Sequence, residues 1–147
     1  MGLSCMHKKM RRLQSDCVQA FTQAEMDVET FVSLPRAWWP KEWANMKDPV
    51  CPLRLALYGH PKSGDLWHDK LDAVLKENGF ETSVEWPSLY WKNHYSSATR
   101  EGKPEHELFT ILVYVDDLLI FGSEALDPII AEIRSKIEME EPKPIDQ

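Results

Sequence analysis

Two adjacent carboxylates, Asp116 and Asp117, interrupt the most apolar stretch of this 147-residue chain. The flanking segments 108–115 and 118–121 are rich in β-branched and aromatic side chains, which is typical of buried strands. Because burying two unpaired carboxylates is costly, we expect the pair at a hairpin apex, with Val115 and Asp116 as the central turn residues. Two-residue hairpins usually carry Asn-Gly or Gly-X there. A turn that departs from its local rule predicts a functional site.

Three motifs follow one another along the chain. The first is Asp-Cys-Val-Gln-Ala-Phe at positions 16–21, followed by an acidic stretch, a short strand pattern and a proline. The second is Leu-Ala-Leu-Tyr-Gly at 55–59, with Ser-Gly at 63–64, and the third is the hairpin at 112–121. Together they resemble the reverse transcriptase of copia-type LTR retrotransposons. The resemblance covers about residues 11–141.

The resemblance implies an RNA-directed DNA polymerase, which adds deoxynucleotides to a primer on an RNA or DNA template. Nucleotidyl transfer is catalysed by two divalent cations about 3.5–4 Å apart, and Mg²⁺ or Mn²⁺ prefers oxygen ligands. We therefore expect Asp16 and Asp116 to bridge the two metals, with Asp117 beside the primer-side metal or in support. The alternative is that Asp16 caps a strand end and that Asp116 and Asp117 form a solvated turn.

Three further residues are expected at the substrate. The resemblance places Phe21 under the incoming sugar, where its ring would select deoxynucleotides, and Tyr114 under the primer end. Each of them also suits an ordinary core or strand position. Lys62 stands where the family has a glutamine beside the nascent base pair. A lysine can hold a phosphate but lacks the paired donor and acceptor of an amide, so the alternative for Lys62 is a solvated residue before a helix.

Two amphipathic helices are predicted. The first begins at Ser63 and is closed by Asn-Gly at 78–79. The second opens with Asp-Pro at 127–128, and Pro142 and Pro144 are expected to stop it. The apolar residues that keep helical spacing are Leu66, Trp67, Leu71, Val74 and Leu75 in the first helix and Ile129, Ile130, Ile133 and Ile137 in the second.

The remaining segments predict the fold class. A strand pair is expected around 81–84 and 88–92, separated by Pro87, and a polar loop at 96–105 leads into the hairpin. This order agrees with an α+β fold, an antiparallel sheet with helices on one face and the carboxylates on the other. The resemblance identifies it as a ferredoxin-like polymerase palm with the fingers and thumb missing or partial.

A loop rich in tryptophan and proline, 34–52, separates the first two motifs. Its three tryptophans, Trp38, Trp39 and Trp43, could stack on nucleobases, because ring stacking tolerates any base. Burial of such large rings more often pins a long loop onto the core, and we favour that alternative.

Composition limits the class of protein and its setting. The length suits one domain, here 1–147, and no apolar run is long enough to span a bilayer. Cys5, Cys17 and Cys51 show no pairing pattern, which favours an intracellular setting without distinguishing cytoplasm from nucleus. The formal net charge is −7, although duplex binding relies on Lys and Arg to neutralise phosphates. The basic residues cluster only at 7–12.

The short segments before the first motif and after the second helix predict a fragment of a retrotransposon polyprotein. The partners of the intact enzyme would be a primer-template, deoxynucleotides and the polyprotein segments for fingers, thumb, ribonuclease H and integrase. We expect the isolated chain to be inactive. The alternative is a non-catalytic remnant that folds at most as a soluble module. A metal-dependent phosphatase or nuclease would need a supporting His or Glu constellation, which the sequence lacks.

Overall fold

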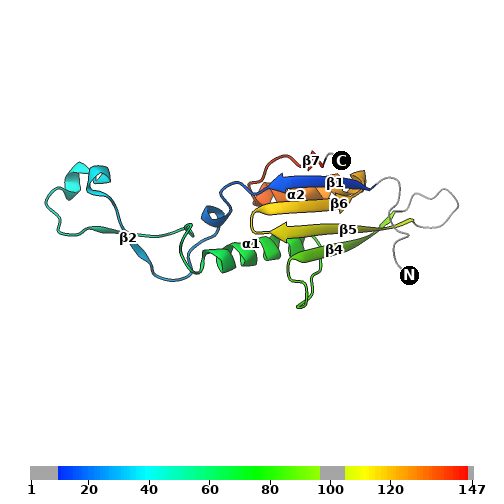
Figure 1. Cartoon of the computed structure of the whole chain (residues 1–147), viewed down its shortest axis with the longest axis horizontal. Helices are drawn as coiled ribbons and strands as arrows, with labels where there is room; N and C mark the ends of the chain where they lie inside the picture. The colour runs from blue at the N-terminus through cyan, green and yellow to red at the C-terminus, as the bar shows by residue number, and fades with distance from the viewer. Residues whose placement is uncertain (1–9, 97–104, 146–147) are drawn as a thin grey trace.

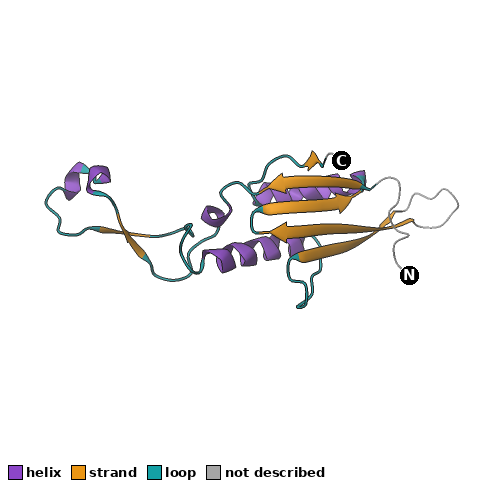
Figure 2. Ribbon diagram, in the orientation of Figure 1, coloured by secondary structure: helices purple, strands orange, loops and turns teal. Residues whose placement is uncertain are grey.

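The computed structural model describes residues 10–96 and 105–145 of the chain. Its elements form an antiparallel sheet, a separate two-stranded ribbon and two α-helices (Figure 1, Figure 2). They are, in chain order, β1 (Arg11–Asp16), η1 (Ala20–Gln23), β2 (Phe31–Ser33), η2 (Arg36–Trp38), η3 (Lys41–Trp43), β3 (Val50–Pro52), α1 (Ser63–Glu77), β4 (Leu89–Ser96), β5 (Glu105–Tyr114), β6 (Asp117–Gly122), η4 (Glu124–Leu126), α2 (Asp127–Lys136) and β7 (Lys143–Pro144), where η marks a 3₁₀ turn.

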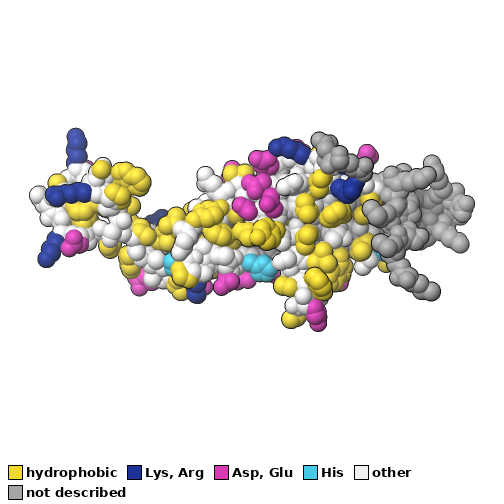
Figure 3. Space-filling view, in the orientation of Figure 1, with side chains coloured by type: hydrophobic (Ala, Val, Ile, Leu, Met, Phe, Trp, Pro, Cys, Tyr) yellow, Lys and Arg dark blue, Asp and Glu magenta, His cyan; other side chains and the backbone are white. Residues whose placement is uncertain are grey.

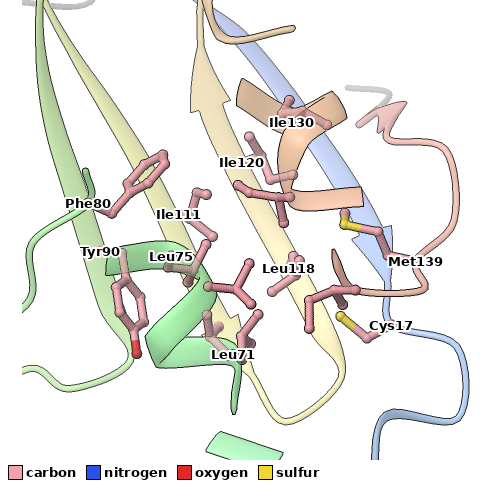
Figure 4. Packing of buried hydrophobic residues seen from close by; sticks show 14 of the residues in the cluster. Cys17, Leu71, Leu75, Phe80, Tyr90, Ile111, Leu118, Ile120, Ile130 and Met139 are labelled. Carbon is pink, nitrogen blue, oxygen red and sulfur yellow. The ribbon is translucent and has the colours of Figure 1, made fainter. Parts of the chain in front are cut away.

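The main sheet has the strand order β4-β5-β6-β1-β7, and all its neighbours are antiparallel. Side chains alternate along each strand, so that in β6 Leu118 and Ile120 are buried while Leu119 and Phe121 are only half-buried. The buried face packs on both helices in one continuous core (Figure 4). The other face is open. The predicted antiparallel sheet with two helices is therefore confirmed.

Helix α1 follows the sequence pattern closely. It begins at Ser63, and Asn78 caps it before Gly79, whose φ of 81° suits a residue without a side chain. Helix α2 begins at Asp127 with a proline in its first turn, also as predicted.

The predicted end of α2 is wrong, because the helix stops at Lys136, well before Pro142 and Pro144. Ile137 already has extended geometry, with a φ of −124°. The extended chain points both Ile137 and Met139 into the core, which a continued helix would not do. The i+4 spacing of the isoleucines is compatible with either geometry, so the sequence pattern does not separate them.

The strand predicted at 81–84 is also wrong. Glu81 forms a single bridge to Trp91, with N–O distances of 2.8 and 2.9 Å, and the chain then turns through 83–88. Val84 is 94% exposed, so this segment has no buried face that would keep it beside β4. On its other edge, β4 pairs with β5 along its whole length. The predicted polar loop 96–105 falls at 97–104 outside the described residues, as do Cys5 and residues 7–9 of the basic cluster.

Residues 31–52, here called the tryptophan arm, contain the ribbon β2–β3 and the turns η2 and η3. The arm extends away from the main sheet (Figure 1). None of its tryptophans is buried, and the core cluster contains no residue of the arm. The favoured prediction that these rings pin the loop onto the core is therefore wrong. Among the helices of the described residues, none is both long enough and apolar enough to cross a membrane.

Candidate functional site at the β5–β6 turn

Strands β5 and β6 are joined by the two residues Val115 and Asp116, and Tyr114 and Asp117 form the last cross-strand pair. This confirms the predicted apex. Val115 has a φ of 56°, and Asp116 is not among the residues with a positive φ. This combination of φ signs is that of a type II′ turn. A β-branched residue with positive φ is an outlier that costs on the order of 1–3 kcal/mol. The rest of the structure must therefore hold this turn in place.

Two hydrogen bonds hold the strained turn from opposite sides. The indole Nε1 of Trp67 in α1 donates to the carbonyl oxygen of Val115 at 2.7 Å. The backbone N–H of Cys17, which follows β1, donates to the carbonyl of Asp116 at 2.8 Å. Trp67 is only 2% exposed, so its N–H and the core around it fix the turn together. The helical pattern predicted Trp67 on the buried helix face but not this bond; the one available signal is that a buried indole N–H needs an acceptor.

The turn brings the three aspartates to one end of the sheet. Asp16 lies directly opposite Asp117 in the β1–β6 register. Because the bond from Cys17 to Asp116 marks the next pair as hydrogen-bonded, Asp16 and Asp117 form a non-hydrogen-bonded pair, whose Cα atoms lie about 4.5 Å apart. Both side chains belong to the open face, and Asp116 is adjacent in the turn. Figure 3 shows acidic side chains gathered at this end of the strands.

The carboxylates of this cluster have no protein counter-ion in the part of the chain that the structure describes. Within the described residues, no Lys, Arg or His forms an ion pair with Asp16, Asp116 or Asp117. A weak hydrogen bond joins Gln14 Nε2 to Asp117 Oδ1 at 3.4 Å. Partial burial, followed by the charges of Asp116, Asp117 and Glu140, raises the pKa of the Asp16 carboxyl above its ordinary value.

These donors fit a hard divalent cation by their chemistry, because they are oxygen ligands with unneutralised charge. The described part of the chain nevertheless contains no group of three or more His, Cys, Asp or Glu side chains already gathered to hold a metal ion. Carboxylates without a cation between them repel one another.

Cys17 lies behind the carboxylates on the buried face. Burial raises the pKa of its thiol to about 12, and the charges of Asp16, Asp116 and Asp117 act in the same direction. The thiol is therefore protonated at neutral pH and serves the core rather than nucleophilic chemistry.

The three expected substrate residues lie in different surroundings. Phe21 in η1 packs on Tyr58, with ring centroids 4.5 Å apart, and lines a cavity of about 230 Å³ beside the turn. Tyr114 is 76% exposed at the end of β5, next to the carboxylates. Lys62 instead forms an exposed ion pair with Asp27 at 3.2 Å, immediately before α1. The structure thus brings Phe21 and Tyr114 to the turn and shows no contact between Lys62 and the aspartates.

Sequence reasoning also missed the segment that follows α2. The backbone N–H of Glu140 donates to the carbonyl of Asp16 at 2.8 Å, and the buried hydroxyl of Ser15 donates to the carbonyl of Glu140 at 2.8 Å. The Glu140 carboxylate pairs with Lys143 at 2.8 Å. This segment fixes the end of β1 that carries Asp16. No local pattern predicts a contact between residues so distant in the chain.

The model of the family described as reverse transcriptase (RNA-dependent DNA polymerase) matches residues 3–146. The chain belongs to the reverse transcriptase family. Its resemblance to retrotransposon reverse transcriptases is thereby confirmed, and it is a reverse transcriptase domain of the kind found in retrotransposon Pol polyproteins. No solved structure matches this reverse transcriptase chain significantly.

The curated relatives of this reverse transcriptase chain are plant transposon polyproteins. It is 28% identical over 111 residues to the retrovirus-related Pol polyprotein from transposon TNT 1-94 of Nicotiana tabacum. The aligned segment covers 76% of this chain and 8% of the relative. It is 33% identical over 111 residues to the corresponding polyprotein from transposon RE1 of Arabidopsis thaliana, covering 76% of this chain and 7% of the relative. The chain therefore spans less than a tenth of the length of either relative.

Proposed function

We propose that this chain is the palm of an RNA-directed DNA polymerase and that Asp16, Asp116 and Asp117 hold a pair of Mg²⁺ or Mn²⁺ ions. The observation that carries the proposal is the cross-strand pairing of Asp16 with Asp117 on the open face, with Asp116 adjacent and no described cation among them. The antiparallel sheet, covered by helices on its other face, supports the palm assignment.

When bound, two such cations stabilise the attacking and leaving oxygens during transfer of a deoxynucleotide to the primer. The chain itself positions the three carboxylates that would hold these cations. Strand β1 presents Asp16, strand β6 presents Asp117, and the strained turn carries the half-buried Asp116 next to Asp117. Trp67 is a positioning residue, because its N–H fixes the carbonyl at the start of the turn.

We further propose that Phe21 and Tyr114 contact the nucleotide and the primer end. The support is their position beside the turn, Phe21 in the cavity wall and Tyr114 exposed next to Asp117. Lys62 is proposed to hold a phosphate. Its pairing with Asp27 is exposed, and such pairs are typically worth about 0–1 kcal/mol, so the ammonium group can exchange partners at little cost.

Metal binding by the purified chain tests the proposal. We expect Mn²⁺ to bind the wild-type protein, detected by electron paramagnetic resonance, and Asp116→Asn to weaken that binding at least about tenfold, since one of the three carboxylates that would hold the ions is removed. Asp48→Asn is the matched control, because it removes the same charge from the exposed arm. A wild-type chain that binds no Mn²⁺, or an equal loss in both variants, would contradict the proposal and favour a non-catalytic module.

The isolated 147 residues are expected to give no measurable primer extension. A duplex is held mainly through Lys and Arg on its phosphates, and this chain has a formal net charge of −7. Extension assays with a labelled primer on RNA and DNA templates would check this. Incorporation by the wild type that Asp116→Asn abolishes would show that the chain is active by itself.

A further inference from the structure

The side-chain amide of Gln23, at the end of η1, joins two segments that lie far apart in the chain. Its Nε2 donates to the carbonyl of Val18 at 2.6 Å and to the carbonyl of Glu138 at 2.8 Å. Its Oε1 accepts from the backbone N–H of Glu138 at 2.8 Å. Both the donor and the acceptor side of this amide are thus bonded to the backbone.

These bonds complete an interrupted antiparallel ladder beside the end of β1. Cys17 and Met139 form an antiparallel bridge there, and the N–H of Val18 donates to the carbonyl of Glu138 at 2.9 Å (Figure 4). In a continuing ladder, the N–H of Glu138 would donate back to the carbonyl of Val18. The Gln23 amide bonds to both of these groups instead. The chain can therefore leave the ladder after Val18 without leaving either group unpaired.

The loop that leaves the ladder carries Phe21. It begins with Gln19, whose φ of 47° turns the chain, and continues as the single 3₁₀ turn η1. Such short turns have little stability of their own, so the ring of Phe21 depends on tertiary contacts for its place. The segment that holds Gln23 also reaches Asp16, because the N–H of Glu140 donates to the Asp16 carbonyl at 2.8 Å. One short segment thus links the loop of Phe21 to the first aspartate.

We infer that Gln23 is a positioning residue for the incoming nucleotide. Its amide holds the ring of Phe21 at a fixed place relative to Asp16 and thereby sets the preference for deoxynucleotides over ribonucleotides. The inference rests on the proposed contact between Phe21 and the nucleotide. Gln23 acts through that ring, since its own polar atoms are occupied by backbone groups.

The nucleotide preference of the full chain tests the inference. The affinities for dATP and for ATP are measured by isothermal titration calorimetry in the presence of Mn²⁺, and we expect the wild type to prefer dATP. Gln23→Met keeps the length of the side chain but makes none of its hydrogen bonds, so the ratio of the two affinities is expected to fall at least about fivefold. Gln23→Glu is expected to lower the ratio further, because its carboxylate would face two carbonyl oxygens.

Two controls separate positioning from general damage to the fold. Gln19→Glu makes the same change in the same loop as Gln23→Glu, but the Gln19 side chain is exposed and makes no capping hydrogen bond, so the ratio is expected to stay unchanged. The affinity for Mn²⁺ alone is expected to stay as in the wild type in every variant at position 23, because the pairing of Asp16 with Asp117 does not involve Gln23. Circular dichroism verifies that each variant is folded.

A double-mutant cycle tests whether Gln23 acts through Phe21. Phe21→Ala is expected to lower the preference for dATP by itself, and Gln23→Met is expected to add nothing in that background, because the ring that it positions is gone. A merely structural role of Gln23 would instead weaken both nucleotides equally and leave the ratio of their affinities unchanged.

The inference is overturned if Gln23→Met keeps the wild-type ratio, if Gln23→Glu changes the ratio no more than Gln19→Glu does, or if Gln23→Met lowers the ratio equally with and without the ring of Phe21. A wild type that binds Mn²⁺ but shows no preference for dATP, or binds neither nucleotide, also overturns it and leaves the metal site standing. A wild type that binds no Mn²⁺ overturns the proposed function, and this inference with it.

Discussion

The β5–β6 turn and the tryptophan arm are both built around an indole N–H bonded to a carbonyl, but over very different chain separations. Trp67 reaches Val115, which is 48 residues away, and lies in the core. Trp39 reaches Leu34, which is 5 residues away, in a segment without buried residues. The turn is thus fixed by the whole fold, whereas the arm is shaped by its own local contacts. The first arrangement suits a site that needs constant geometry, whereas the shape of the arm does not depend on the core.

The largest expected contrast concerns stability. Trp67→Ala leaves a cavity in the core, and such substitutions cost about 3–5 kcal/mol. Trp38→Ala removes an exposed ring and is expected to change the free energy of unfolding by less than about 0.5 kcal/mol. Urea denaturation followed by circular dichroism measures both. Similar decreases in the two variants would show that the arm is coupled to the core after all.

A second pair of substitutions tests the two indole hydrogen bonds without removing the aromatic ring. Trp67→Phe leaves the Val115 carbonyl without its buried donor, which is expected to cost about 1–3 kcal/mol. Trp39→Phe exposes the Leu34 carbonyl near solvent, where water can replace the donor, so a smaller cost is expected. Amide hydrogen exchange would then speed up at 116–118 in the first variant only. Unchanged amide hydrogen exchange at 116–118 in Trp67→Phe would show that Trp67 does not position the turn.

Positive φ values offer a third comparison, since Val115 has a φ of 56° and Asp48 in the arm has a φ of 50°. A β-branched residue is strained there, whereas aspartate tolerates this region. Val115→Gly is therefore expected to stabilise the chain by on the order of 1 kcal/mol, and Asp48→Gly to have little effect. Thermal unfolding of both variants provides the measurement. A destabilised Val115→Gly would mean that its side chain contributes more than its backbone strain costs.

The smallest expected effect depends on pH. Because partial burial and, after it, the charges of its acidic neighbours raise the pKa of Asp16 above 3.8, the folded chain binds this proton more tightly than the unfolded chain does. Stability contributed by this group therefore falls as pH rises from 3.8 through the raised pKa. Without divalent cations, Asp16→Asn is expected to raise the unfolding midpoint slightly at pH 7, with the gain shrinking toward pH 4.

Asp48→Asn is the charge-matched reference for this experiment, because it changes the net charge equally at a distant place. If Asp16→Asn is no more stable than Asp48→Asn at pH 7, burial of the Asp16 carboxylate and its repulsion by Asp116 and Asp117 are too weak to matter.

Local patterns predicted the parts of the fold that local physics decides. The apolar run around Asp116 predicted the hairpin, and helix-start residues placed the beginnings of α1 and α2 correctly. The strand at 81–84 and the end of α2 were wrong, because burial decides both of them. Val84 is 94% exposed and the chain turns away from β4 after Glu81, whereas burial of Met139 favours an extended chain after Lys136.

The candidate site likewise has a part that local patterns predicted and a part that depends on contacts between distant segments. Motif order drew attention to Asp16, Asp116 and Asp117, and the structure places them at one end of the sheet, although their role as metal ligands stays a prediction. The partners of Trp67 and Glu140 had no local signal, since each contact joins segments far apart in the chain. The arm was misjudged because a general tendency of tryptophan toward burial was applied to a segment with no core to reach.

Side chains of β1 alternate between the buried and the open face of the sheet, so the number of residues in this strand decides which of them face the interior. Ser15 and Cys17 face the interior on either side of Asp16, so inserting or deleting one residue between Arg11 and Asp16 would turn the carboxylate inward and a small neutral side chain outward. Length variation in this strand is therefore incompatible with the acidic cluster, whereas the arm can gain or lose residues at its tip without altering which side chains reach the acidic end of the sheet.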